Sequence, residues 1–92
     1  MNQRIIDFLE KRCSPKDNIL FAQDLAVAPE ENLKLWMHIL AHMVTPNDDN
    51  FIIWEHALEA ALKAADMLRS GLAPSVVMEY LVSETYIVLR ST

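Results

Sequence analysis

The chain has 92 residues, with a net charge of −5 at pH 7 and a single cysteine, Cys13. Its length suits one small domain, its acidic balance disfavours a phosphate backbone as partner, and a lone cysteine excludes an internal disulfide. No apolar run approaches the roughly 20 residues of a membrane-spanning helix, and the N-terminus lacks the apolar core of a secretory signal, so we expect a cytoplasmic protein.

Prolines and one glycine divide the chain into helical segments. Each of the four prolines precedes a segment with helical periodicity, where its missing N–H and fixed φ favour a helix start. Gly71, the only glycine, suits the C-terminal cap of a helix. We therefore predict an all-α fold, a compact single-domain bundle of four to five short helices. The expected helices cover residues 2–12, 15–27, 29–44, 50–70 and 74–90.

The first three of these segments have the outline of a DNA-reading module. They contain RIIDFLEKR, ILFAQDLA and PEENLKLWMHIL in order. In that order and spacing they resemble the first three helices of winged-helix and helix-turn-helix regulators. The resemblance implies a transcription regulator that places these helices on DNA and dimerises through the last two. The basic side chains available for DNA contact would be Arg4, Lys11, Arg12, Lys16 and Lys34.

The chemistry of the third segment departs from that family. Its N-terminal end, which would enter the major groove, carries Glu30 and Glu31, and these carboxylates would face phosphates. Lys34 is the only Lys or Arg in this segment, whereas a groove reader normally holds backbone and bases with several Arg, Lys or Gln side chains. We therefore keep DNA binding as the alternative hypothesis and regard nucleic acid as a disfavoured partner.

A histidine pair in the same segment raises the question of a metal. His38 and His42 are four residues apart, a spacing at which two imidazoles of one helix can ligate one ion. The glutamate of a catalytic H-E-x-x-H site is absent, and the pair lies on the outward face, with His56 and Glu55 as the obvious further ligands. We expect these histidines to be solvated, with no metal site and no cofactor.

Leu35 and Ile39 lie beside the histidines, between the outward face and the core face of segment 29–44. They widen its apolar arc to roughly 200°, more than a peripheral helix of a small bundle needs. This surplus makes Leu35, Ile39, His38 and His42 a first candidate partner-binding surface. Burial of the two apolar side chains under a neighbouring helix is the other interpretation.

Segment 50–70 is rich in alanine and has a wide apolar arc. Alanines allow another helix to approach closely, so we expect this helix at the centre of the bundle, at a dimer seam, or at both. The flank formed by Phe51, Leu58 and Leu62 is the second candidate partner-binding surface.

The last segment, 74–90, ends in ETYIVLR, which is rich in β-formers and leaves a strand as an alternative. We predict a helix because the apolar residues of this segment fall on one face at helical spacing. A chain with one glycine contains no Walker loop, dinucleotide fingerprint or nucleophile elbow, so we expect no enzyme.

These patterns favour a small non-enzymatic protein that binds another protein through apolar helix faces. It would act as a regulator, adaptor, inhibitor or chaperone, as a homodimer or within a complex with a different protein.

Overall fold

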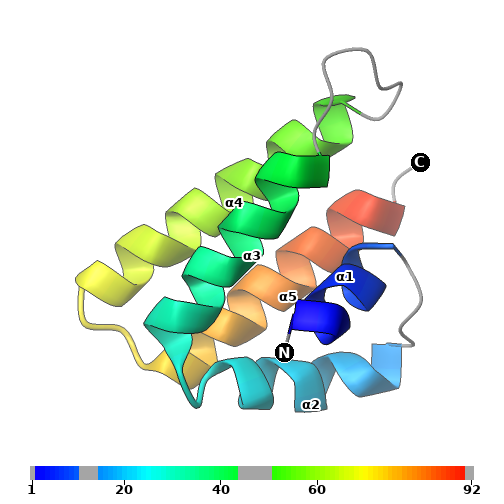
Figure 1. Ribbon diagram of the computed structural model, residues 1–92. Helices are drawn as coiled ribbons and strands as arrows, with labels where there is room; N and C mark the ends of the chain where they lie inside the picture. The colour runs from blue at the N-terminus through cyan, green and yellow to red at the C-terminus, as the bar shows by residue number, and fades with distance from the viewer. Residues whose placement is uncertain (1, 11–14, 44–50, 91–92) are drawn as a thin grey trace.

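A computed structural model describes residues 2–10, 15–43 and 51–90. Within these ranges the fold is all-α, with five helices and no strand, as predicted (Figure 1). None of the helices described is long and apolar enough to cross a lipid bilayer. The helices are α1 (Asn2–Leu9), α2 (Pro15–Leu25), α3 (Pro29–Met43), α4 (Phe51–Arg69) and α5 (Pro74–Arg90).

The helix boundaries follow the prolines and the glycine closely. Prolines begin α2, α3 and α5. Gly71 ends α4 in a left-handed conformation, with φ of 86°. The N–H of Gly71 donates to the carbonyl of Leu68 at 3.1 Å, and the N–H of Leu72 donates to the carbonyl of Met67 at 3.2 Å. This pair of bonds is the Schellman cap, so the predicted role of Gly71 is confirmed.

The C-terminal segment is a helix and not a strand. α5 continues through the β-forming residues to Arg90. It buries Leu81, Val82, Thr85 and Leu89 along one side, and this packing outweighs the intrinsic preference of β-branched residues for strands.

The helices pack against one another in pairs (Figure 1). α3 and α4 run antiparallel, and α4 also packs against α5, which in turn packs against α2. α1 packs against α3. Ala57, Ala61 and Ala64 of α4 are completely buried, and their small side chains allow the close helix contacts that the sequence predicted.

An aromatic cluster joins the first three helices. The ring centroids of Phe8 and Phe21 lie 5.2 Å apart, and that of Trp36 lies 5.5 Å from Phe8 and 5.9 Å from Phe21. These separations are typical of favourable aromatic pairs. Trp36 is fully buried and Trp54 nearly so, so both tryptophans belong to the core.

Candidate protein-binding surface

A groove of about 310 Å³ lies between the N-terminal half of α3 and the C-terminal half of α4. Its lining residues repeat every three or four positions, which places them on the facing sides of the two antiparallel helices. The α3 side consists of Glu30, Leu33, Lys34 and Met37, and the α4 side of Ala65, Leu68 and Arg69. We call this feature the α3–α4 groove.

The floor of the α3–α4 groove is apolar. Leu33 is buried, whereas Met37, Ala65 and Leu68 are half-buried and pack against the core from the side of the groove. Ala65 leaves space where a larger residue would fill the gap between the helices. Parts of these apolar side chains therefore remain open to a ligand from outside.

The rim of the groove carries charge. Glu30, Lys34 and Arg69 are exposed. Arg69 donates to the carboxylate of Asp66 on the same helix, an exposed pair that contributes little to stability. Lys34 makes no ion pair with any residue that the structure describes, which leaves one uncompensated positive charge beside an apolar floor.

The second predicted surface continues this groove along α4. Phe51, Leu58 and Ala65 follow one another at seven-residue intervals, which is about two helical turns, and Leu62 falls between the last two on the same side. The exposed fraction is 49% for Leu62 and 38% for Phe51, and Leu58 is half-buried. Helical periodicity predicted that this flank of α4 is apolar, but periodicity does not show how closely α3 covers α4.

The apolar part of the first predicted surface is largely covered. Ile39 has an exposed fraction of 7%, and Leu35 is half-buried against the core. Leu35 lies about 160° around α3 from Met37, so this flank faces away from the α3–α4 groove. The prediction of an exposed apolar surface at Ile39 is therefore corrected: its side chain belongs to the core, as the alternative interpretation held.

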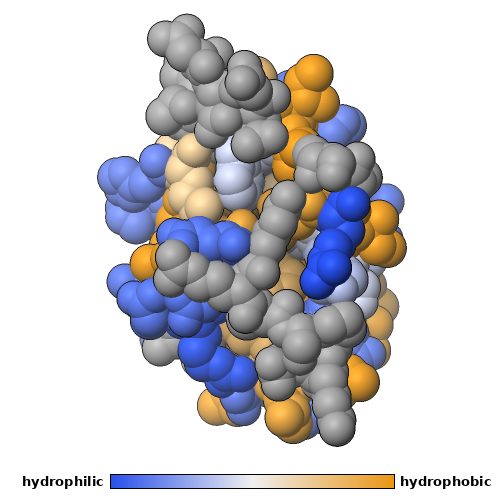
Figure 2. Space-filling view, turned by 90° about the vertical axis from the view of Figure 1, so that its right-hand side faces the viewer, coloured by the Kyte–Doolittle hydropathy of each residue, from blue (hydrophilic) through white to orange (hydrophobic). Residues whose placement is uncertain are grey.

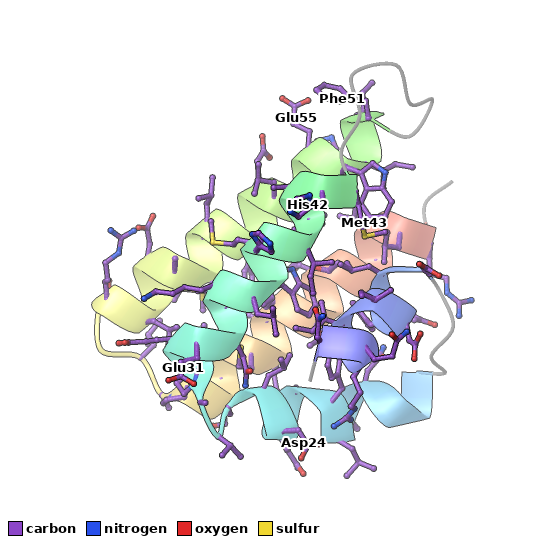
Figure 3. The ribbon with its side chains drawn as sticks, viewed as in Figure 1. Asp24, Glu31, His42, Met43, Phe51 and Glu55 are labelled. Atoms are coloured by element: carbon purple, nitrogen blue, oxygen red, sulfur yellow. The ribbon has the colours of Figure 1, made fainter. Side chains whose placement is uncertain are left out.

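His38 and His42 of α3 are exposed, and Figure 3 shows His42 on α3. The Nε2 atoms of His38 and His42 are 3.2 Å apart. His56 instead has its Nδ1 3.7 Å from a carboxylate oxygen of Glu59, on α4 itself. No three His, Cys, Asp or Glu side chains gather as a metal site in the part of the chain that the structure describes, so His56 and Glu55 do not complete a cluster with the α3 pair.

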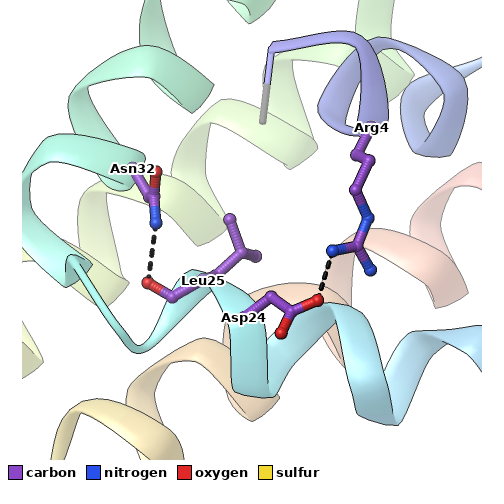
Figure 4. Close-up of polar contacts among 4 residues, drawn as sticks. All are labelled: Arg4, Asp24, Leu25 and Asn32. Carbon is purple, nitrogen blue, oxygen red and sulfur yellow. Dashed lines mark hydrogen bonds and ion pairs between the residues drawn. The ribbon is translucent and has the colours of Figure 1, made fainter.

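Polar contacts within the fold hold the corner between α2 and α3 and link α1 to α2 (Figure 4). The Asn32 amide donates to the Leu25 carbonyl at 3.0 Å. Arg4 is paired with Asp24, and its guanidinium carbon lies 5.3 Å from the centroid of the Phe21 ring. The one described N-terminal base is therefore engaged within the fold.

Among the other bases of the DNA hypothesis, Lys34 is the one whose side chain the structure describes. Glu30 and Glu31 are exposed at the start of α3, and Lys34 lies on the rim of the α3–α4 groove. The described residues thus present carboxylates where a reading helix would meet phosphates. Lys11, Arg12 and the side chain of Lys16 lie outside the part of the structure that is described.

A second, more polar groove of about 240 Å³ lies between α4 and α5. It includes His56 and Glu59 at one end, and the Nζ of Lys63 lies 5.9 Å from the ring centroid of Tyr80. The side chains of His56 and Glu59 are 58% and 70% exposed. Water therefore reaches both side chains freely.

Other exposed apolar side chains are distributed over several helices. Ile19 and Leu20 lie on α2, Ile52 on α4, and Ile87 on α5. On the face viewed in Figure 2, apolar residues alternate with hydrophilic ones outside the grey atoms. Scattered apolar residues of this kind are normal on a protein surface. The α3–α4 groove differs because several apolar side chains converge there in a concave site.

The chain matches no protein-family model, and comparisons with curated proteins and with solved structures give no match.

Proposed function

We propose that this protein is a small, non-enzymatic, protein-binding regulator or adaptor of the cytoplasm, and that the α3–α4 groove receives an apolar helix face of its partner. The observation that carries the proposal is the open apolar floor between α3 and α4. It continues along α4 to the half-exposed Leu62. Inhibitors and chaperones that act by covering a partner's surface use the same kind of contact.

A helix is the partner element that suits this shape. A groove between two helices accepts apolar side chains spaced at i, i+3, i+4 and i+7, which a third helix presents along one face. The floor offers Met37, Ala65 and Leu68 to such side chains, and Leu62 continues the contact. Fully burying one Leu-sized side chain contributes about 1.5–3 kcal/mol, so two or three anchors would supply most of a moderate affinity.

The charges on the rim define the partner further. Lys34, which has no ion-pair partner among the described residues, favours a partner helix that carries a carboxylate next to its apolar stripe, because an opposite charge fixes orientation and speeds association. Glu30 lies one turn away and disfavours a second acid at that end. The partner helix is supplied either by a second copy of this chain or by a different protein.

Two matched variants test the proposal. Leu62→Glu introduces a charge into the apolar strip that Phe51, Leu58 and Leu62 form beside the groove. Ile19→Glu makes the same kind of change on α2, which contributes no residue to the groove. We expect proteins from the cell of origin that bind immobilised wild-type protein to be retained by Ile19→Glu and lost by Leu62→Glu. The molar mass from light scattering shows whether a second copy is among them.

Retention of the same proteins by both variants would contradict the proposal. So would a strictly monomeric wild-type protein from which Leu62→Glu removes no bound protein.

A further inference from the structure

The two exposed histidines of α3 form a contact that the bundle does not require. Their Nε2 atoms are 3.2 Å apart, their ring centroids 4.5 Å apart, and the rings meet edge to face at 79°. In the absence of an ion, one Nε2–H can donate to the other Nε2, with the direction set by the tautomers. Neither side chain is buried, so core packing does not fix this arrangement.

The separation of the nitrogens matches the distance between two ligands of one metal ion. With metal–nitrogen bonds of about 2.05 Å, nitrogens 3.2 Å apart subtend an angle of about 100° at the metal. This value lies between the angle of about 90° in a square or octahedral site and that of about 109° in a tetrahedral site. Ligation requires both rings to carry the proton on Nδ1 and to turn slightly, and exposed side chains can make both adjustments.

We infer that His38 and His42 form a two-imidazole chelate for a borderline divalent transition-metal ion, such as Zn²⁺, Ni²⁺ or Cu²⁺. Imidazole nitrogens suit these ions, whereas Mg²⁺ and Ca²⁺ prefer oxygen ligands. No third His, Cys, Asp or Glu joins the pair among the residues described. The remaining coordination positions are therefore open to water or to a ligand from another molecule.

The chelate also links metal binding to the stability of α3. Its two ligands lie one helical turn apart near the C-terminal end of the helix. The ion binds with both nitrogens only when this turn is helical. Metal binding therefore favours the folded state, as any ligand does that binds the folded chain in preference to the unfolded one.

Isothermal titration of the full chain, freed of any polyhistidine tag and of chelator, tests the inference with Zn²⁺ and Ni²⁺. We expect one ion per chain, and affinity at least about tenfold weaker in both His38→Ala and His42→Ala, since even loss of an outer-shell partner costs about 10- to 100-fold. Both positions are exposed in a helix, where alanine is well tolerated. Mg²⁺ should not compete.

The third described histidine provides the matched control. His56→Ala removes an exposed imidazole from α4 and should leave Zn²⁺ binding unchanged. The melting temperature of the wild type and of His56→Ala should rise with Zn²⁺, and that of His38→Ala should not. Absence of uptake by the wild type, or uptake equal to wild type in either α3 variant, would overturn the inference. A loss in His56→Ala as large as in the α3 variants would do the same.

Discussion

Met37 of α3 and Ala65 of α4 line one groove, although 28 positions separate them in the chain. Their neighbours at one-turn spacing, Leu33 and Leu68, extend the same apolar floor. α3 and α4 pack antiparallel (Figure 1), and the concave surface lies between them. An apolar strip that one small core leaves partly open is suited to a helix of a partner.

Stability measurements should distinguish the groove from the core. Leu62 is 49% exposed and Leu40 is fully buried. We expect Leu62→Glu to change the free energy of unfolding by less than about 1 kcal/mol and Leu40→Ala to lower it by about 2–5 kcal/mol. Urea unfolding followed by circular dichroism measures both. A large loss in Leu62→Glu would show that Leu62 is a core residue.

Thr85 should be a site where an apolar substitution stabilises the fold. Its side chain is completely buried and its Oγ1 has no hydrogen-bond partner among the residues that the structure describes, so the hydroxyl was removed from water without compensation. We expect Thr85→Val, which keeps the shape, to raise the free energy of unfolding by about 1 kcal/mol.

Thr85→Ser is the matched control, because it keeps the hydroxyl and removes the buried methyl group. We expect it to lower the free energy of unfolding by about 1 kcal/mol. If Val destabilises as much as Ser does, the hydroxyl has a partner in solution.

Substitution of Gly71 should destabilise the fold because of the backbone conformation alone. An added Cβ would meet no atom within 4 Å, but φ is +86°. We expect Gly71→Ala to lower the free energy of unfolding by about 1–2 kcal/mol, and Gly71→Asn to lower it less, because asparagine tolerates the left-handed region. Thermal unfolding of the two variants compares them. Equal stability of Gly71→Ala and wild type would contradict the cap.

DNA binding should be absent at physiological salt. The exposed carboxylates of Glu30 and Glu31 and the pairing of Arg4 with Asp24 argue against a phosphate contact at α3. We expect fluorescence anisotropy with a duplex to show no saturable binding at about 0.15 M salt. Affinity that falls steeply with salt and weakens in Arg12→Ala would support the regulator alternative instead.

The sequence was sufficient to predict the helices, but it was not sufficient to predict which of their surfaces are covered by a neighbouring helix. Prolines and Gly71 are local signals that act within a few residues, so the starts of α2, α3 and α5 and the cap of α4 could be predicted. Helical periodicity also predicted α5 correctly against the β-preference of its last turns.

Which flank of a helix is covered depends on its neighbours, and periodicity does not supply that information. A wide apolar arc predicted Leu35 and Ile39 as part of a partner-binding surface, but Ile39 lies in the core. Met37 packs against the core and at the same time lines the groove. The spacing of His38 and His42 can be read from the sequence, whereas the 3.2 Å separation of their Nε2 atoms depends on the side-chain rotamers, which only the structure shows.

Site-specific photo-crosslinking in the cell of origin tests the central claim most directly. A photoreactive phenylalanine analogue at Leu62 would lie in the apolar strip beside the α3–α4 groove, and the same residue at Ile19 would lie on α2, outside it. We predict a discrete protein adduct from position 62, either with a second copy or with one different protein, and no such adduct from position 19. Adducts of equal yield from both positions, or none from position 62, would contradict a partner docked in the α3–α4 groove.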